Sequence, residues 1–343
     1  MGLRNISLAA TALVFAHAGA AFADSGSFGD WAVVCDNGRT CTAMGFGDLG
    51  EMGSSALLLL TRDAEAQAPP RVSLITAGTA ATTLALSVDG VTPPGLAALP
   101  ATPMADDDER RITELTPDQT RALLAVLANG RTLTLVEGRN PAAAISLRGS
   151  SAALRFVDDR QKRAGTVSAL VARGARPASE TPAPPAIPRV TAAPAVAQTR
   201  LPAVPTSAFQ GRLADCDDDI AELGFAPEVA RLGQGRLFWG VVCSRGAYNV
   251  IYRLFLTDER GGDVRALELS YPSGETTSEL MNISFEPATQ TLSNFDKGRG
   301  LGDCGAITRW VWTGEAFTLE HQVLMPECQG VMPDQWPVSY RSR

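Results

Sequence analysis

A proline-rich stretch near the middle of the chain limits what the 343-residue sequence can fold into. Residues 175–207 read ARPASETPAPPAIPRVTAAPAVAQTRLPAVPTS, with eight of the 22 prolines and no aromatic residue. Such a composition favours an extended, semi-rigid spacer of about 3 Å per residue. We therefore predict two modules, residues 24–174 and 208–343, joined by a linker over 175–207. Because the linker offers little apolar surface to order it, the modules are expected to be independent.

The first 23 residues have the features of a signal peptide. Arg4 supplies a positive charge, ISLAATALVFA is an apolar core, and Ala21-Phe22-Ala23 is a small-x-small cleavage site. The apolar core is shorter than the roughly 20 residues that a membrane-spanning helix needs, and no later stretch is long enough. We predict cleavage before Asp24, no transmembrane segment in the mature chain, and export to the periplasm.

All six cysteines follow the predicted cleavage site. An even number of cysteines in an exported chain predicts disulfides. Cys35 and Cys41 are the only two in the first module, so they are expected to pair around a loop with an Asn37-Gly38 turn signal. The other four allow three connectivities. We favour the two bonds that join segments near in sequence, Cys216–Cys243 and Cys304–Cys328.

The N-terminal module mixes strand and helix signals. Short apolar or alternating runs such as SALLLLT, RVSLIT and TLALSV predict strands. Thr116, Pro117 and Gln119 predict the start of a helix with a capping box, and Gly130 is expected to end it in a left-handed conformation. A second helix is expected from Ser150 or Ser151 through SALVA, with a break at Gly165.

The C-terminal module is expected to be mainly antiparallel β-structure. Runs such as RLFWGVVC, YNVIYRLFLTD and FTLEHQVLM recur at the spacing of meandering sheets, and WTGEAF predicts a hairpin turn. The acidic run DCDDDIAELG, with Asp215 and Asp217–Asp219, predicts a short helix with its acids at the positive end. The predicted fold class is therefore α+β: a mixed sheet with two helices, the proline-rich linker, and a mainly antiparallel β module with a short helix.

Several stretches resemble a known family. FGDWAVVCDNGRTCTA, CSRGAYNVIY, and LSNFDKGRGLGDCG followed by WVWTGEAFTLE resemble the proteobacterial domain-of-unknown-function family numbered 1176. FGDW, the first cysteine pair and AISLRGSSAAL also resemble the invasion-associated locus B proteins of alphaproteobacteria. The resemblance implies export and a common fold, and it provides no catalytic residue to transfer to this chain.

The loop DKGRGLGDCG, Asp296–Gly305, is the stretch most suggestive of a site. It lacks the glycine-lysine spacing of a phosphate loop and the oxygen positions of an EF-hand. A looser calcium site using Asp296 and Asp303 stays open. In the simplest interpretation the loop is a tight corner pinned by Cys304, with positive φ at Gly300 and charges that each contribute at most about 0.5 kcal/mol to stability. As a recognition loop it would display Asp296, Lys297, Arg299 and Asp303.

Catalytic signals are weak. His321 is the only histidine after the signal peptide, and its strand pattern favours a packed residue. There is no G-x-S-x-G motif, and the cysteines lack zinc-site spacing, so no cofactor or metal is expected. Trp310 and Trp312 alternate along one strand, which favours a core stripe over a carbohydrate platform. Paired carboxylates for glycoside chemistry stay open.

Charge and compartment restrict the function further. A net charge of −7 without a basic cluster argues against nucleic acid as a partner. We predict a non-enzymatic envelope protein that binds an envelope protein or glycan. One alternative is a periplasmic protein like the lysozyme inhibitors, and another is a hydrolase of envelope glycans or peptides that uses carboxylates. The inhibitor alternative rests on analogy of fold alone.

Overall fold

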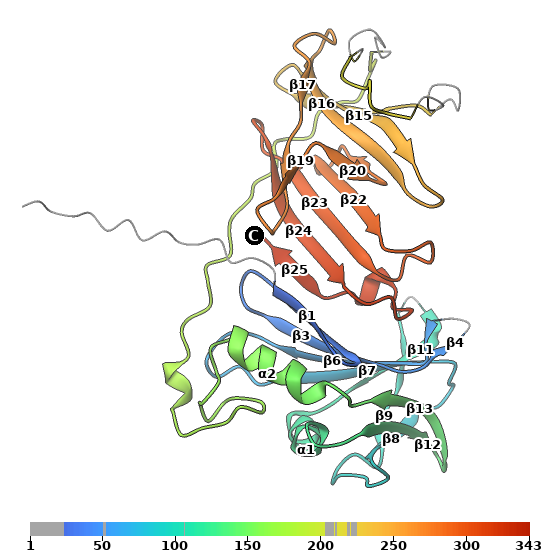
Figure 1. The fold of residues 1–343 in the computed structure, drawn as a ribbon, viewed down its shortest axis with the longest axis vertical. Helices are drawn as coiled ribbons and strands as arrows, with labels where there is room; N and C mark the ends of the chain where they lie inside the picture. The colour runs from blue at the N-terminus through green and yellow to red at the C-terminus, as the bar shows by residue number, and fades with distance from the viewer. Residues whose placement is uncertain are drawn as a thin grey trace, which may run out of the picture.

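The computed structural model describes residues 24–343 with gaps at 51–52, 106, 203–208, 210, 218–219 and 221–224 (Figure 1). The predicted signal peptide lies outside the described residues. Among the described residues, no helix combines the length and apolar character needed to cross a membrane.

The predicted α+β class is wrong, because the described chain is predominantly antiparallel β-structure. Its α-helices are α1 (Pro117–Leu127) and α2 (Ser150–Arg160), and its short 3₁₀ turns are η1 (Ala178–Glu180) and η3 (Pro333–Gln335). Stretches without a strong strand signal, such as Cys41–Phe46 and Asn140–Ser146, also join sheets. Pairing with neighbouring strands therefore outweighs their weak local preference.

A seven-stranded antiparallel sheet forms the centre of the N-terminal half. Its strands, in spatial order, are β1 (Asp24–Phe28), β2 (Trp31–Cys35), β3 (Cys41–Phe46), β6 (Ala56–Arg62), β7 (Arg71–Ala77), β11 (Asp107–Glu114) and β10 (Thr102–Met104). A small pair, β4 (Leu49–Gly50) and β5 (Gly53–Ser54), extends from it. A separate sheet has the order β13 (Asn140–Ser146), β12 (Thr132–Glu137), β8 (Thr83–Val88) and β9 (Leu99–Pro100).

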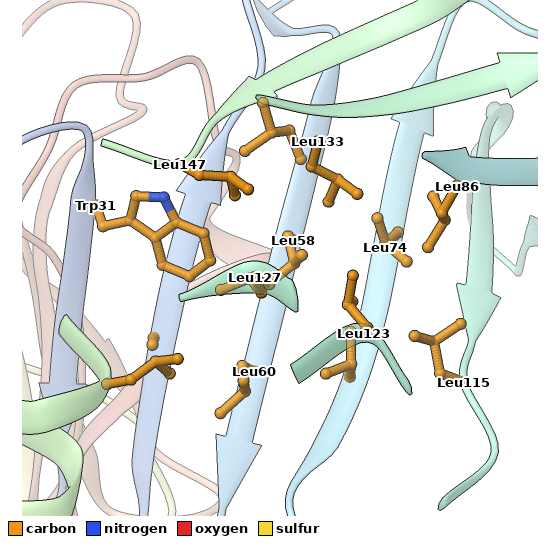
Figure 2. Close-up of a cluster of buried hydrophobic side chains, with 14 of the residues drawn as sticks. Trp31, Leu58, Leu60, Leu74, Leu86, Leu115, Leu123, Leu127, Leu133 and Leu147 are labelled. Carbon is orange, nitrogen blue, oxygen red and sulfur yellow. The ribbon is translucent and has the colours of Figure 1, made fainter. Parts of the chain in front are cut away.

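One face of the seven-stranded sheet is covered by the smaller sheet and both helices. Figure 2 shows Trp31, Leu58 and Leu74 of the large sheet in one layer of side chains with Leu123 of α1 and Leu133 of β12. These side chains belong to a single buried apolar cluster. The hydrophobic effect at this interface therefore fixes both helices on the same side of the sheet.

Helix α1 begins as predicted. The Thr116 side chain accepts from the Gln119 backbone N–H, and the Gln119 side chain accepts from the Thr116 N–H, which completes a capping box. The prediction for Gly130 is wrong, because its φ is not positive. A Cβ there would lie 2.4 Å from Val88 Cγ1, so the glycine permits close packing of the helix end instead.

Helix α2 is shorter than predicted and ends at Arg160. The carboxylate of the buried Asp158 accepts backbone N–H bonds from Leu170, Val171 and Ala172 at 2.7–3.0 Å. The segment after the helix therefore folds back around this carboxylate. Those three N–H groups bond to a side chain where a continuous helix would bond them to carbonyls.

The C-terminal half contains two larger antiparallel sheets. The first has the order β14 (Glu228–Gly233), β15 (Arg236–Arg245), β16 (Val250–Asp258) and β17 (Arg265–Ala266), with β20 (Glu279–Met281) also paired to β16. The second has the order β21 (Ser284–Glu286), β22 (Thr291–Lys297), β23 (Gly305–Trp312), β24 (Phe317–Met325) and β25 (Val338–Arg341). A short hairpin, β18 (Leu269–Ser270) and β19 (Thr276–Thr277), lies beside them.

The apolar residues of the C-terminal half form their own core. Trp310 and Trp312 are fully buried in it, which confirms the predicted core stripe. The predicted hairpin turn is also confirmed, since Thr313 N donates to Ala316 O between β23 and β24. The predicted acidic helix lies partly outside the described residues. Of its acids, Asp215 pairs with Arg253, and Asp217 accepts from the Arg245 N–H.

The two halves share a third apolar cluster, in contrast to the predicted independence. Val34 and Met44 on the second face of the large sheet pack with Met325 and Trp336 of the C-terminal half. All five residues of β2 are buried because both faces of its sheet are covered. Arg341 Nε lies 2.6 Å from Asp36 Oδ2, which adds an ion pair across the same junction. Figure 1 shows the β21–β25 sheet of the C-terminal half standing over the seven-stranded sheet of the N-terminal half.

The described part of the linker, residues 175–202, is hydrogen-bonded to both halves. Ala183 O accepts from Arg39, Val190 N donates to Arg343 O, and Ala193 N donates to Trp312 O. Figure 1 shows this segment running along the side of both halves. The linker therefore acts as a strap whose backbone bonds replace the apolar contacts that its composition lacks. The residue boundaries of the modules stay a prediction.

The three predicted disulfides are confirmed. Their Cα atoms lie 4.0–4.7 Å apart, and the described residues contain no free cysteine. The first pair joins directly opposed residues of β2 and β3. The bonded pairs are Cys35–Cys41, Cys216–Cys243 and Cys304–Cys328.

Candidate functional site

The loop between β22 and β23 is a corner held by its own backbone. Gly298 N donates to Cys304 O at 2.9 Å, and Gly302 N donates to Arg299 O at 3.0 Å. Positive φ occurs at Gly302 (71°) and Gly305 (123°) and not at the predicted Gly300. At Gly305 an added Cβ would lie 1.9 Å from the carbonyl oxygen of Asp296. The corner therefore requires glycine at a position other than the predicted one.

Two of the four predicted recognition residues bind each other. Arg299 donates to both carboxylate oxygens of Asp303, with Nε at 2.6 Å from Oδ1. The Asp303 side chain is 0% exposed and also accepts from the Gly330 N–H at 2.6 Å. Hydrogen bonding to Arg299 lowers the pKa of Asp303 despite the opposing effect of burial. Asp303 therefore links this loop to the loop at 330.

Lys297 and Asp296 lie in different surroundings. The Lys297 ammonium lies 5.3 Å from the centroid of the Phe295 ring. Asp296 accepts from Asn294 Nδ2 at 2.7 Å and from the Tyr271 hydroxyl at 3.4 Å. Burial raises the pKa of Asp296 against the lowering effect of these bonds, and burial and the nearby carboxylate also raise the pKa of Tyr271. Asp296 is thus a partly buried acid without a basic partner among the described residues.

The two loop carboxylates do not engage a common group. Asp303 binds Arg299 and Gly330, whereas Asp296 binds Asn294 and Tyr271. Across the described ranges, no three His, Cys, Asp or Glu side chains lie together in a way that could hold a metal ion. The arrangement therefore offers no support for the looser calcium site.

Asp296 lines a hollow in the C-terminal half, which we call the polar hollow. Its volume is about 760 Å³, and the described lining residues include neither Lys nor Arg. The hollow opens between β20, the β18–β19 hairpin and the face of β22–β24. Its polar lining includes Tyr271, Glu275, Glu279, Asp296 and Gln322.

A buried polar row supports the polar hollow. Asn294, Thr308 and Gln322 are cross-strand neighbours on β22, β23 and β24, and all three are buried. Asn294 Oδ1 accepts from Thr308 N, and Gln322 Nε2 donates to Thr308 Oγ1 at 2.8 Å. Such satisfied networks hold their members in one arrangement. Gln322 therefore presents a fixed polar wall to the hollow.

A second hollow lies where the two halves meet, and we call it the junction groove. Its volume is about 890 Å³. It lies between β7 and β11 on one side and Leu301 and Met332 on the other. Leu301 is 56% exposed and Met332 is 40% exposed, although both are large apolar residues. The predicted recognition loop thus lines one hollow with Asp296 and the other with Leu301.

Asp296 was predicted from the sequence as a site residue, whereas Tyr271, Gln322 and Leu301 were not. Leu301 had a signal, since it is the only large apolar residue in a loop of glycines and charges. Tyr271 and Gln322 had none, because distant strands bring them to the hollow. His321 is partly buried on β24, where burial and then Arg309 lower its pKa.

Comparison with known proteins places the chain in a family. Residues 25–343 match the family described as "Protein of unknown function (DUF1176)", and the chain belongs to it. The "Uncharacterized protein YpfG" of Escherichia coli (strain K12) is 30% identical over 335 residues, 92% of each chain. A crystal structure of invasion associated protein B from Bartonella henselae is 17% identical, with a TM-score of 0.32 over 40% of this chain and 98% of that chain. The family resemblance expected from the sequence is therefore confirmed.

Proposed function

From membership of this family, whose description names no reaction, we propose that the protein is an exported, non-enzymatic binding protein of the cell envelope. The three disulfides support export, because disulfides persist in oxidising compartments such as the periplasm. The predicted signal peptide also indicates export. The ligand site that we assign is the polar hollow.

We assign a hydroxyl-rich ligand, an envelope glycan, to this hollow. The observation that carries the assignment is the described lining, which contains hydrogen-bond acceptors, the Gln322 amide and the Tyr271 ring but neither Lys nor Arg. Carboxylates accept hydrogen bonds from sugar hydroxyls, whereas an anionic ligand would meet repulsion from Glu275 and Glu279. The volume falls within the range of about 300–1,000 Å³ that is common for small-ligand sites.

The hollow has the mixed surface that a sugar needs. Leu280, Ile251 and Leu324 line it beside the polar groups, so it can receive a carbon face as well as hydroxyls. The Tyr271 ring is held edge-on against Trp310, with centroids 5.4 Å apart. A pre-positioned ring lowers the entropic cost of binding.

The test is calorimetric titration of the full chain with soluble peptidoglycan fragments and with a panel of neutral oligosaccharides. Binding of at least one of these, weakened about tenfold by Glu275→Gln, supports the proposal. Glu315→Gln is the matched control, since Glu315 is another exposed glutamate outside the hollow. No binding by any probe, or equal effects of the two substitutions, contradicts it.

A hydrolase using carboxylates is the second candidate. It is favoured by one observation: the raised pKa of Asp296 in the same hollow as Glu279, which Arg253 holds at 2.5–3.0 Å. Two carboxyl groups in one site, one of them with a raised pKa, are the pattern of glycoside hydrolysis. Release of reducing ends from peptidoglycan that Asp296→Asn abolishes, with binding retained, would establish this candidate instead.

The third candidate, a lysozyme inhibitor, has one feature in its favour. Leu301 is exposed on a loop with a rigid backbone, so it could enter a cleft in a partner. Inhibition of muramidase by the full chain, lost in Leu301→Asp, would support it. Wild-type inhibition by that variant would exclude the loop as the inhibitory element.

A further inference from the structure

The junction groove is separate from the polar hollow and has a different character. Six large hydrophobic residues are exposed among the described residues, and two of them, Leu301 and Met332, lie on this groove. Its wall continues through Leu57, Ile75 and Val331 into the apolar cluster between the halves. Concentrated exposed apolar surface is typical of a binding site.

The backbone beside the groove favours an occupant without peptide groups. The groove lies over β7 and β11, which pair with each other through Ala77 and Arg110. The edge strand β10 is not among the described residues that line the groove. A peptide added as a strand needs a free sheet edge, and this wall is a sheet face. An acyl chain needs only apolar contact, which this wall provides.

The rim of the groove carries both signs of charge. Arg110 is engaged by Asp107 and, across the junction, by Asp334 at 3.1 Å. In the described part of the chain, Asp108, Glu109 and Arg111 also line the groove and form no ion pair. A headgroup with one ammonium and one phosphate would complement this set, because the carboxylates attract the ammonium and the guanidinium binds the phosphate.

We propose that the junction groove binds a zwitterionic phospholipid of the envelope. One acyl chain lies against Leu301, Met332 and Ile75. The headgroup lies at the rim, with its amine at Asp108 and Glu109 and its phosphate at Arg111. Met332 suits this role because its flexible thioether adapts to chains of different shape. The proposal is independent of the glycan assignment, since none of the described residues lines both hollows.

The test is calorimetric titration of the full chain with palmitoyl lysophosphatidylethanolamine below its critical micelle concentration. Glycerophosphoethanolamine has the same headgroup without a chain and should not bind. Palmitoyl lysophosphatidylglycerol keeps the chain with an anionic headgroup and should bind about tenfold more weakly. Equal binding of the two lipids, or binding of the headgroup alone, would overturn the assignment of chain and rim.

Matched variants locate the site. Leu301→Asp should weaken lipid binding at least tenfold, because it places a charge against the acyl chain. Val167→Asp is the control: Val167 is 57% exposed, almost the same as Leu301, and lies away from the groove. Met332→Ser is the second variant if Leu301→Asp fails to fold. Failure of the lipid to bind, or equal loss of binding in Leu301→Asp and Val167→Asp, would refute the proposal.

Discussion

Arg299→Ala should destabilise the protein, whereas Lys297→Ala, two residues away, should not. Both side chains belong to the same loop, and from sequence each was expected to contribute at most about 0.5 kcal/mol. In the structure, the Lys297 ammonium lies over the Phe295 ring, while Arg299 is the cationic partner of the buried Asp303. Removing Arg299 leaves that carboxylate buried with only the Gly330 N–H among its described side-chain bonds.

The geometry sets the size of the effect. Breaking a fully buried ion pair costs about 3–5 kcal/mol. Arg299 is 41% exposed, so solvent screening reduces its contribution, although Asp303 itself is fully buried. We therefore expect Arg299→Ala to lower the free energy of unfolding by about 1–3 kcal/mol and Lys297→Ala by less than about 0.5 kcal/mol.

The assay is urea unfolding of both variants at neutral and acidic pH. The pKa of Asp303 is lowered in the folded state, mainly by hydrogen bonding to Arg299. Its stabilising contribution is therefore present above the unfolded pKa, which is about 3.9, and is lost as pH falls through the folded pKa. The deficit of Arg299→Ala should shrink as the pH is lowered below about 4.

Two outcomes would refute this reasoning. If Arg299→Ala and Lys297→Ala unfold at the same urea concentration, the ion pair does not stabilise the loop. If the deficit of Arg299→Ala does not change with pH, the loss comes from packing and not from the Asp303 carboxylate.

Three further predictions follow from the same structure. Gly305→Ala should lower the free energy of unfolding by at least about 2 kcal/mol, because the added Cβ would clash with the carbonyl oxygen of Asp296. Gly300→Ala should change the free energy of unfolding by less than about 0.5 kcal/mol. Equal unfolding midpoints of the two variants would contradict this. The pKa of Asp296 is raised in the folded state, so its stabilising contribution is present below the unfolded pKa of about 3.9 and is lost as pH rises through the folded pKa. Asp296→Asn should therefore flatten this part of the stability profile, above pH about 4, in urea titrations. An unchanged profile would exclude Asp296 as its source. After trypsin cleavage at Arg189 or Arg200 in the strap, the two halves should stay bound through their shared apolar cluster and elute as one peak in gel filtration. Two separate fragments would show that the halves are independent, as expected from the sequence.

Local signals were sufficient for several elements. The capping box at Thr116 and Gln119 lies within one helical turn, and the Trp310–Trp312 alternation lies within one strand. The disulfides could be predicted because each bond joins two cysteines that are near each other in the sequence. In each case the residues that decide the structure are close together in the chain.

Long-range contacts account for what the sequence missed. The run at Trp31–Cys35 is buried on both faces only because a distant half of the chain covers the second face. Order in the strap was not predicted from the sequence, because its hydrogen-bond partners, such as the backbone carbonyl of Trp312, lie far along the chain. Within the loop, the spacing of Arg299 and Asp303 permits a pair, but the burial of Asp303 depends on the loop at Gly330.

Hydrogen–deuterium exchange with a neutral oligosaccharide tests most directly whether the polar hollow is the ligand site. Backbone amides in residues 271–281 and 294–298, together with Gln322, should exchange more slowly with the glycan than without it. The same segments should show no change in a variant that carries Glu275→Gln and Asp296→Asn. Protection confined to other segments, or no protection at a saturating concentration of glycan, would contradict the assignment of this hollow.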